Sequence, residues 1–125
     1  MSKFYLEKKE FPEREVAVIF VNGYLDSKAF DKFTDFIDEI ARGGIVRIVI
    51  NMKDLNYISS AGLATILGEI KELRELGGDL KICQMSPKIK NLFDMLGFSR
   101  LVQIFEKQEE AINKFEEEKK KMDDY

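Results

Sequence analysis

The sequence predicts an α/β fold, in which a mostly parallel or mixed sheet of four or five strands is packed with about four helices. Two observations carry this prediction. Runs of β-branched and other apolar residues alternate along the chain with segments whose apolar residues recur every three or four positions. A single helical segment separates successive strand-like runs, and this order is typical of right-handed crossovers between parallel strands.

The strand-like segments are short and rich in valine and isoleucine. The run "EVAVIFVNGYLD" predicts a strand from its β-branched residues and an end near Asn22-Gly23, a turn dipeptide. Residues 45 to 52, "IVRIVINM", are apolar at almost every position, which is typical of a strand covered on both faces. The other predicted strands are residues 3 to 8 at an edge, "LKICQM" and, last and short, "RLVQIF".

Two long segments carry the spacing and the end signals of amphipathic helices. The first has Asp26 or Ser27 as its N-cap and Gly43 just beyond its end. The second runs from about 61 to 76 and stops at Gly77-Gly78. Their apolar faces consist of Phe30, Phe33, Ile37 and Ile40 in the first, and of Leu63, Ile66, Leu67, Ile70, Leu73 and Leu76 in the second.

A shorter helix is predicted by "SPKIKNLFDMLG". Ser86 is its N-cap, Pro87 occupies the first helical position, and Gly97 stops it. Its apolar face consists of Ile89, Leu92, Phe93 and Leu96.

The last segment, "KQEEAINKFEEEKKKMDDY", predicts a charged helix with Ala111, Ile112 and Phe115 as its apolar anchors. Three glutamates from position 116 stand three or four residues before three lysines, which is the spacing for ion pairs on one helix surface. The composition favours a solvated, fraying helix end over residues 116–125.

Length and charge limit the classes of function. With 125 residues, the chain suits a single domain over residues 1–125. The net charge is -3 and both signs are interspersed, which argues against binding to nucleic acid or to a membrane surface. No apolar run reaches the roughly 18 residues of a membrane span, and "MSKFYLEKKE" lacks the core of a signal peptide. We therefore expect a cytoplasmic protein.

The side chains argue against an enzyme. The chain has no histidine, and so it lacks the commonest general base and the commonest metal ligand. Phosphate-loop and dinucleotide-binding signatures are absent, and we expect no cofactor. Asp35 and Asp38 lie on the polar side of a helix, which predicts solvated carboxylates rather than a metal site. The one cysteine, Cys83, is predicted to be an inert buried thiol without a disulfide partner.

The pair Ser59-Ser60, in "YISSAGL", stands where a loop enters the second long helix. A helix N-terminus presents free N–H groups and a partial positive charge, so it tolerates a phosphate on a serine. Serine is also a good N-cap, worth about 1 kcal/mol. Periodicity leaves both interpretations open.

Residues 46–68, "VRIVINMKDLNYISSAGLATILG", resemble the STAS domains of bacterial anti-sigma factor antagonists. The resemblance consists of an apolar strand, an acidic-leucine turn and a motif of the form D-S-[STA]-G-[LIV] at a helix start. Gly23-Tyr24-Leu25-Asp26 is similar to the G-x-[LIV]-D loop of the family, and "GGDLKICQMSPKIKNLFDMLGF" is similar to its second βα unit. The resemblance covers about residues 14–115 and implies a single STAS-like domain.

The resemblance implies a binding module that is switched by phosphorylation. In the family, the unphosphorylated antagonist binds an anti-sigma factor, itself a serine kinase, and so frees a sigma factor. The kinase phosphorylates the antagonist and releases it, and a metal-dependent serine phosphatase resets it. The acceptor position of the motif is Ser60 here, whereas Ser59 replaces the motif aspartate and is the alternative acceptor. The oligomeric state stays open.

The same match assigns a partner-binding surface. It consists of Tyr24, Asp26, Ser59, Ser60, Ala61 and Gly62. The alternatives are an N-cap role for Asp26, a packing role for Gly62 and a half-buried filler role for Tyr24 and Tyr57. A STAS scaffold in a stress-sensing assembly, a small-ligand sensor and a small enzyme are the other functions that the sequence leaves open.

Overall fold

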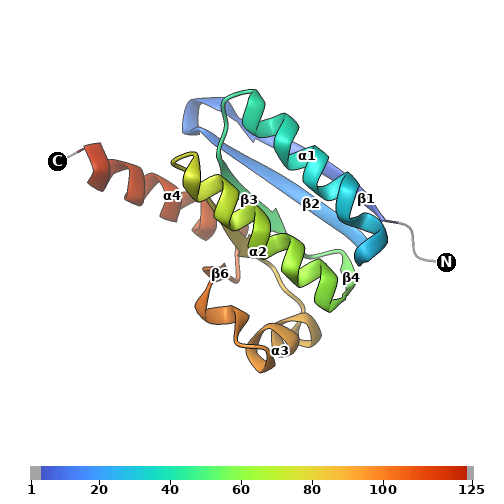
Figure 1. Cartoon of the computed structure of the whole chain (residues 1–125). Helices are drawn as coiled ribbons and strands as arrows, with labels where there is room; N and C mark the ends of the chain where they lie inside the picture. Colours follow the sequence, from blue (N-terminus) through green and yellow to red (C-terminus); the bar gives the residue numbers. More distant parts are fainter. Residues whose placement is uncertain (1–3, 124–125) are drawn as a thin grey trace.

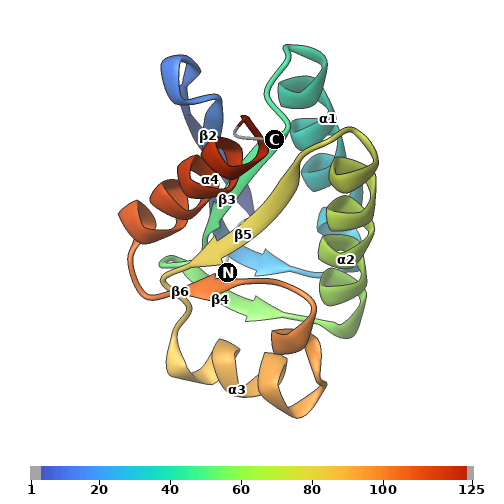
Figure 2. The same cartoon turned by 90° about the vertical axis from the view of Figure 1, so that its left-hand side faces the viewer.

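Helices α1 and α2 cover one face of a mixed sheet, and α4 covers the other face, in the computed structural model of the chain (Figures 1 and 2). The strands are β1 (Tyr5–Phe11), β2 (Val16–Leu25), β3 (Arg47–Asn51), β4 (Leu55–Ile58), β5 (Asp79–Cys83) and β6 (Ile104–Phe105). The helices are α1 (Phe30–Arg42), α2 (Ser60–Glu75), α3 (Pro87–Met95) and α4 (Gln108–Asp123). Short 3₁₀ turns cover Pro12–Arg14, Ser27–Ala29 and Phe98–Arg100. The predicted α/β fold is confirmed.

The structure describes residues 4–123. Lys3, which belongs to the predicted edge strand, lies outside these residues, as do Asp124 and Tyr125 of the predicted last helix. Among the described helices, none combines the length and the apolar character that crossing a bilayer requires.

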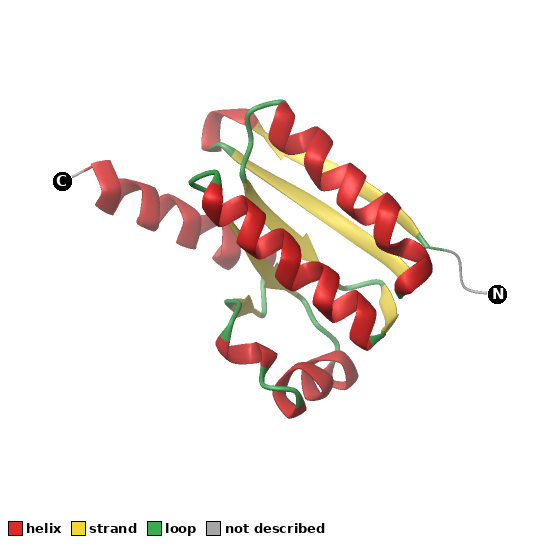
Figure 3. Cartoon of the chain, viewed as in Figure 1, coloured by secondary structure: helices red, strands yellow, loops and turns green. Residues whose placement is uncertain are grey.

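The sheet has the order β1-β2-β3-β5-β6, and β4 pairs separately with β2. Figure 3 draws the strands in yellow and the helices in red. Among the strands of residues 4–123, only the β1–β2 pair is antiparallel. The edge strand predicted at residues 3 to 8 is therefore present, although it continues to Phe11. The short strand β4 was not expected from the sequence, because it has four residues of which only the first and last are buried, so it shows no period of two.

Strand β2 does not end at Asn22-Gly23, and that prediction is wrong. The strand continues to Leu25 through a bulge between Gly23 and Tyr24. Gly23 has φ of 90°, a conformation that glycine adopts without strain, and its N–H donates to the Asp54 carbonyl over 3.1 Å. The turn dipeptide is therefore the point where β2 leaves β3 and pairs with β4.

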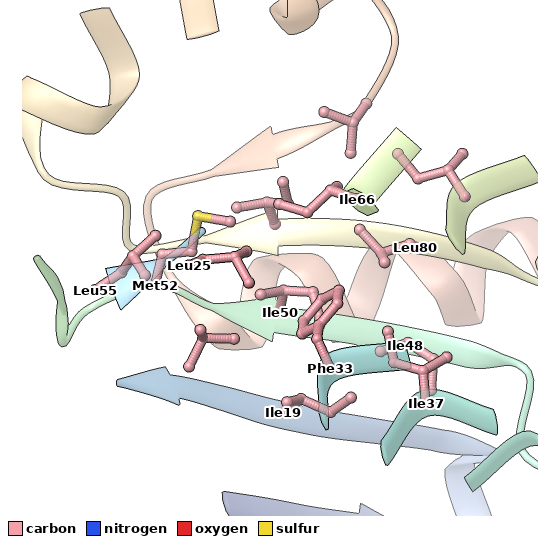
Figure 4. Packing of buried hydrophobic residues seen from close by; sticks show 14 of the residues in the cluster. Ile19, Leu25, Phe33, Ile37, Ile48, Ile50, Met52, Leu55, Ile66 and Leu80 are labelled. Carbon is pink, nitrogen blue, oxygen red and sulfur yellow. The ribbon is translucent and has the colours of Figure 1, made fainter. Parts of the chain in front are cut away.

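The main core lies between the sheet and helices α1 and α2 (Figure 4). Phe33 and Ile37 of α1 and Ile66 of α2 are fully buried, as their spacing predicts, and each contributes roughly 1.5–3 kcal/mol by burial. They pack against side chains of three strands: Ile19, Ile48, Ile50 and Leu80.

Three residues assigned to the apolar helix faces are instead exposed. Phe30, Leu76 and Leu96 are 47%, 62% and 53% exposed. Phe30 is the first residue of α1, and Leu76 and Leu96 directly follow the last residues of α2 and α3. At these helix ends the three- and four-residue spacing still matches the apolar face. The residues, however, lie beyond the part of the sheet that the helix covers.

A smaller apolar cluster lies under α4, on the opposite face of the sheet. It contains the three predicted anchors, Ala111, Ile112 and Phe115. Cys83 belongs to the same cluster, and burial raises the pKa of its thiol to about 12. The prediction of a buried thiol is therefore confirmed.

The charged half of α4 is tied to the rest of the domain at three residues, so the prediction of a solvated, fraying end is wrong for Glu116, Glu118 and Lys119, whereas residues 120–123 are exposed although the helix continues to Asp123. Glu116 accepts from Arg14, and Lys119 pairs with Glu15. Glu118 pairs with Lys81 at 2.9 Å. Glu116, Glu118 and Lys119 therefore pair with other elements rather than with one another.

The buried Lys81 gives one acidic residue of α4, Glu118, a structural role. Its side chain is fully buried in the sheet, with Nζ 4.4 Å from the centre of the Phe115 ring. Glu118 and the Gln103 side chain accept from this ammonium group, and Asp79 lies 3.8 Å away. A buried ammonium without such partners would cost several kcal/mol.

Removal of the Glu118 carboxylate tests this arrangement. We expect Glu118→Ala to lower the free energy of unfolding by about 1 to 2 kcal/mol, because Lys81 would keep only weaker partners. Glu117→Ala is the matched control on the same helix, and its loss should stay below about 0.5 kcal/mol because Glu117 forms only an exposed pair with Lys114. Urea unfolding measures both. Equal losses in the two variants would contradict the assignment.

Candidate partner-binding site around Ser60

Two loops converge where β2 and β4 end side by side. The strands are parallel, and Leu25 stands opposite Ile58. The backbone N–H of Ser59 donates to the Leu25 carbonyl over 3.0 Å, which joins the two loops directly. The N-terminal ends of α1 and α2 lie at the same end of the molecule (Figure 1). Asp26 and the serine pair therefore come together, as the resemblance implies.

The two serines have different environments. Ser59 has extended backbone angles and is half-buried, and its Oγ accepts from the Gly62 N–H over 3.0 Å. Ser60 is the first residue of α2 and is exposed, and its hydroxyl bonds to no other described residue. The N-cap is therefore Ser59, and Ser60 Oγ is free at a helix end with unpaired N–H groups.

Gly62 is a packing residue. It is buried, and a Cβ at this position would lie 2.3 Å from the Leu25 carbonyl oxygen and 3.0 Å from Ile58 Cγ1. The resemblance assigned Gly62 to the partner-binding surface, with a packing role as the alternative. The structure corrects this assignment, because Gly62 is covered and lies against β2.

Asp26 also has a structural role. Its Oδ1 accepts from the Lys28 N–H over 3.0 Å and caps the 3₁₀ turn Ser27–Ala29 before α1. The side chain is half-buried. The N-cap alternative is therefore confirmed, and Asp26 can shape the loop beside Ser60 through this cap.

Exposed aromatic rings stand on the same converging segments as the free hydroxyl. Tyr24 and Tyr57 are 45% and 41% exposed, and their ring centres lie 5.5 Å apart. Phe30 is also exposed. We call the surface formed by Tyr24, Phe30, Tyr57, Ser60 and Ala61 the serine face. Exposed aromatic residues are enriched at protein–protein interfaces.

A hollow of about 340 Å³ adjoins this face between the first turns of α1 and α2. Its lining residues are Ser27, Phe30, Asp31, Ala61, Ala64 and Thr65. Sequence reasoning missed Phe30 as a surface residue because its spacing matches the core face of α1. The signal that could have found it is its position immediately after the cap region of Asp26.

Comparison with known proteins identifies the family. The family model described as "STAS domain" matches residues 7–111. This chain belongs to the STAS domain family. The anti-sigma F factor antagonist of Paenibacillus polymyxa is 31% identical over 104 residues, which are 82% of this chain and 89% of that protein. The chain therefore falls among the anti-sigma factor antagonists of the STAS family, which are regulatory proteins rather than enzymes.

Solved STAS structures agree with this assignment. The anti-sigma factor antagonist SpoIIAA in its unphosphorylated form has a TM-score of 0.72 at 27% identity, covering 90% of this chain and 95% of that one. A structure of the Bacillus cell fate determinant SpoIIAA in the phosphorylated form has a TM-score of 0.65 at 28% identity, covering 90% and 98%. The STAS fold expected from the sequence is confirmed.

Substitution of Gly62 tests how the STAS site is built. We expect Gly62→Ala to lower the free energy of unfolding by about 2 kcal/mol, because the added methyl group meets a backbone carbonyl that cannot move without disturbing β2. Gly68→Ala is the control on the same helix. Nothing lies within 4 Å of its added carbon, so it should stabilise by about 0.5–1 kcal/mol through helix propensity. Thermal unfolding measures whether each variant is more or less stable than the parent. Destabilisation by both variants would contradict the packing role of Gly62.

Proposed function

We propose that the chain is an anti-sigma factor antagonist whose serine face binds an anti-sigma factor with serine kinase activity, and that phosphorylation of Ser60 ends this binding. The unphosphorylated form would free a sigma factor by holding the kinase. A serine phosphatase would return the phosphorylated form to the binding state. We place this cycle in the cytoplasm, where sigma factors act.

One observation carries the proposal: the Ser60 hydroxyl is exposed and unbonded, whereas the Ser59 hydroxyl caps α2. A kinase must bring the γ-phosphate of ATP in line with the acceptor oxygen. Ser60 Oγ can be reached without breaking any hydrogen bond of the domain. Transfer of the phosphate to Ser59 would remove the hydrogen bond by which its Oγ caps the Gly62 N–H. This difference favours Ser60 as the acceptor.

The chemical step needs little from this chain. The Ser60 oxygen forms a bond to the γ-phosphorus, the bond between that phosphorus and the departing ADP oxygen breaks, and the hydroxyl proton leaves to a base. The chain has no histidine, so the kinase would supply that base. Ser60 acts here as a substrate and not as a catalyst.

Phosphorylation would change the charge of the serine face without refolding the domain. A phosphoserine adds about -1.5 to -2 charges, and the free N–H groups at the start of α2 stabilise such an anion. The residues around Ser60 that the partner would cover are mainly aromatic or small. Desolvation of the phosphate and repulsion from an acidic partner group would then oppose docking.

The replacement of the motif aspartate by Ser59 is compatible with this switch. Aspartate and serine are both strong N-cap residues, and each offers a side-chain oxygen to the Gly62 N–H. The cap that positions Ser60 is therefore kept. The substitution removes one negative charge beside the acceptor.

Substitutions at Ser60 test the switch. We expect Ser60→Asp to weaken binding of the cognate anti-sigma kinase about tenfold or more, because it introduces a charge on the docking surface. Ser60→Ala should bind the kinase and take up no phosphate. Calorimetry measures the affinity, and mass spectrometry after incubation with ATP locates the phosphate.

Ser59→Ala is the control for this test. It removes the cap, so the free energy of unfolding should fall by about 1 kcal/mol, while phosphate still appears on Ser60. Phosphate on Ser59 in the parent would move the acceptor by one residue. A bound kinase with no phosphate on either serine would overturn the switch and favour a STAS scaffold or a ligand sensor.

A further inference from the structure

Three carboxylates from two helices meet away from the serine face. Asp38 belongs to α1, and Glu69 and Glu72 stand one turn apart on α2. One oxygen of each carboxylate lies within 4.8 Å of the other two. The two helices lie side by side (Figure 1). At 1.5 Å per residue, Glu69 is about 13 Å along α2 from Ser60.

Glu69 is the unusual member of this cluster. It is 4% exposed, whereas Asp38 is half-buried and Glu72 is exposed. Its Oε2 is buried without a hydrogen-bond partner among the described residues, and the same holds for Thr34 Oγ1 on α1. Within residues 4–123, no lysine or arginine forms an ion pair with any of the three carboxylates. Lys81, the other buried charge, has partners on several sides.

An unpaired buried carboxylate costs several kcal/mol. Burial, followed by the charges of Glu72 and Asp38, raises the pKa of Glu69 to about 7, and the nearby Thr34 hydroxyl opposes this only in part. Burial and the two neighbouring carboxylates thus work against the charged form of Glu69. A cation held by the three oxygens would reverse the balance, because it would be the missing partner of all three groups.

We propose that Asp38, Glu69 and Glu72 bind a divalent cation between α1 and α2, with Ca²⁺ as the preferred ion. The ligand atoms are all carboxylate oxygens, which are the ligands of hard cations. Ca²⁺ takes oxygen ligands at about 2.3–2.6 Å, so oxygens on opposite sides of it are up to about 5 Å apart. The limit of 4.8 Å on the distances between the three oxygens fits this span with little closure of the side chains. Mg²⁺, at about 2.1 Å, would hold the oxygens closer together, within about 4.2 Å of one another.

Thr34 is placed to support the ion. It stands four residues before Asp38 on α1, so the two side chains share one face of the helix. Its hydroxyl is the second buried polar atom without a partner in this region. Water would complete the coordination on the exposed side, next to Glu72. The ion would join α1 to α2, and these helices carry Phe30 and Ser60 of the serine face at their N-termini.

Titration of chelator-treated protein with CaCl₂, MgCl₂ and MnCl₂ tests the site. For an open site with three protein carboxylates we expect Ca²⁺ to bind with a Kd of roughly 0.1–1 mM by calorimetry. At ten times Kd the melting temperature should rise by about 5 °C. Mn²⁺ should broaden the amide NMR signals of residues 34–38 and 69–72 before those of residues 60–62.

Variants decide whether these residues hold the ion. Glu69→Gln keeps the size of the side chain and removes its charge, and Glu72→Gln does the same at an exposed position that cannot affect folding strongly. Both should reduce the Ca²⁺-dependent shift at least fivefold. Asp35→Asn is the control, because Asp35 is exposed on α1 and lies outside the cluster, and it should keep the full shift.

Two outcomes would overturn the proposal. One is no Ca²⁺-dependent shift up to 20 mM, which would leave Glu69 as a protonated buried carboxyl. The other is an equal shift in Glu72→Gln and in the parent, which would mean weak binding elsewhere on the acidic surface. The test does not depend on the proposed phosphoswitch, because Ser60→Ala should bind Ca²⁺ like the parent.

Discussion

The carbonyl of Leu25 fixes the start of α2, and the geometry of the serine face depends on this contact. Its oxygen accepts the Ser59 N–H over 3.0 Å and lies 2.3 Å from where a Cβ of residue 62 would stand. Both contacts come from one helical turn, so this turn has a single position against β2. Ser60 is presented to solvent by the backbone and not by bonds of its own side chain. Its hydroxyl can therefore change chemically while the contact stays intact.

Local patterns were enough to predict the elements whose ends are marked by their own residues. Ser86 and Pro87 start α3, and Ser59 caps α2, because serine side chains accept from N–H groups three residues later. The run at residues 45 to 52 predicted β3, because apolar residues at almost every position of a short run are typical of a strand covered on both faces. The resemblance then added what the local pattern left open, namely that the acceptor position is Ser60 and not the capping residue Ser59.

Contacts between distant segments were beyond the reach of local patterns. Asn22-Gly23 is a turn signal, yet here it forms a bulge, because β4 offers β2 a second partner. Lys81 and Glu69 interrupt otherwise apolar patterns in the same way, and no local rule separates them. Lys81 meets the carboxylate of Glu118, whereas Glu69 meets only like charges and one hydroxyl. The difference is set by which helix packs on each face of the sheet.

Helix α2 links two sites of opposite electrostatic character. Its N-terminus carries free N–H groups beside Ser60, and its middle carries the Asp38–Glu69–Glu72 cluster about 13 Å away. Charges at the surface are largely screened beyond the Debye length of about 10 Å at 0.1 M salt. A phosphate on Ser60 and a cation at the cluster would thus influence each other little by direct Coulomb attraction. Any coupling would instead act through the packing of α1 against α2, which sets the relative positions of Phe30 and Ser60.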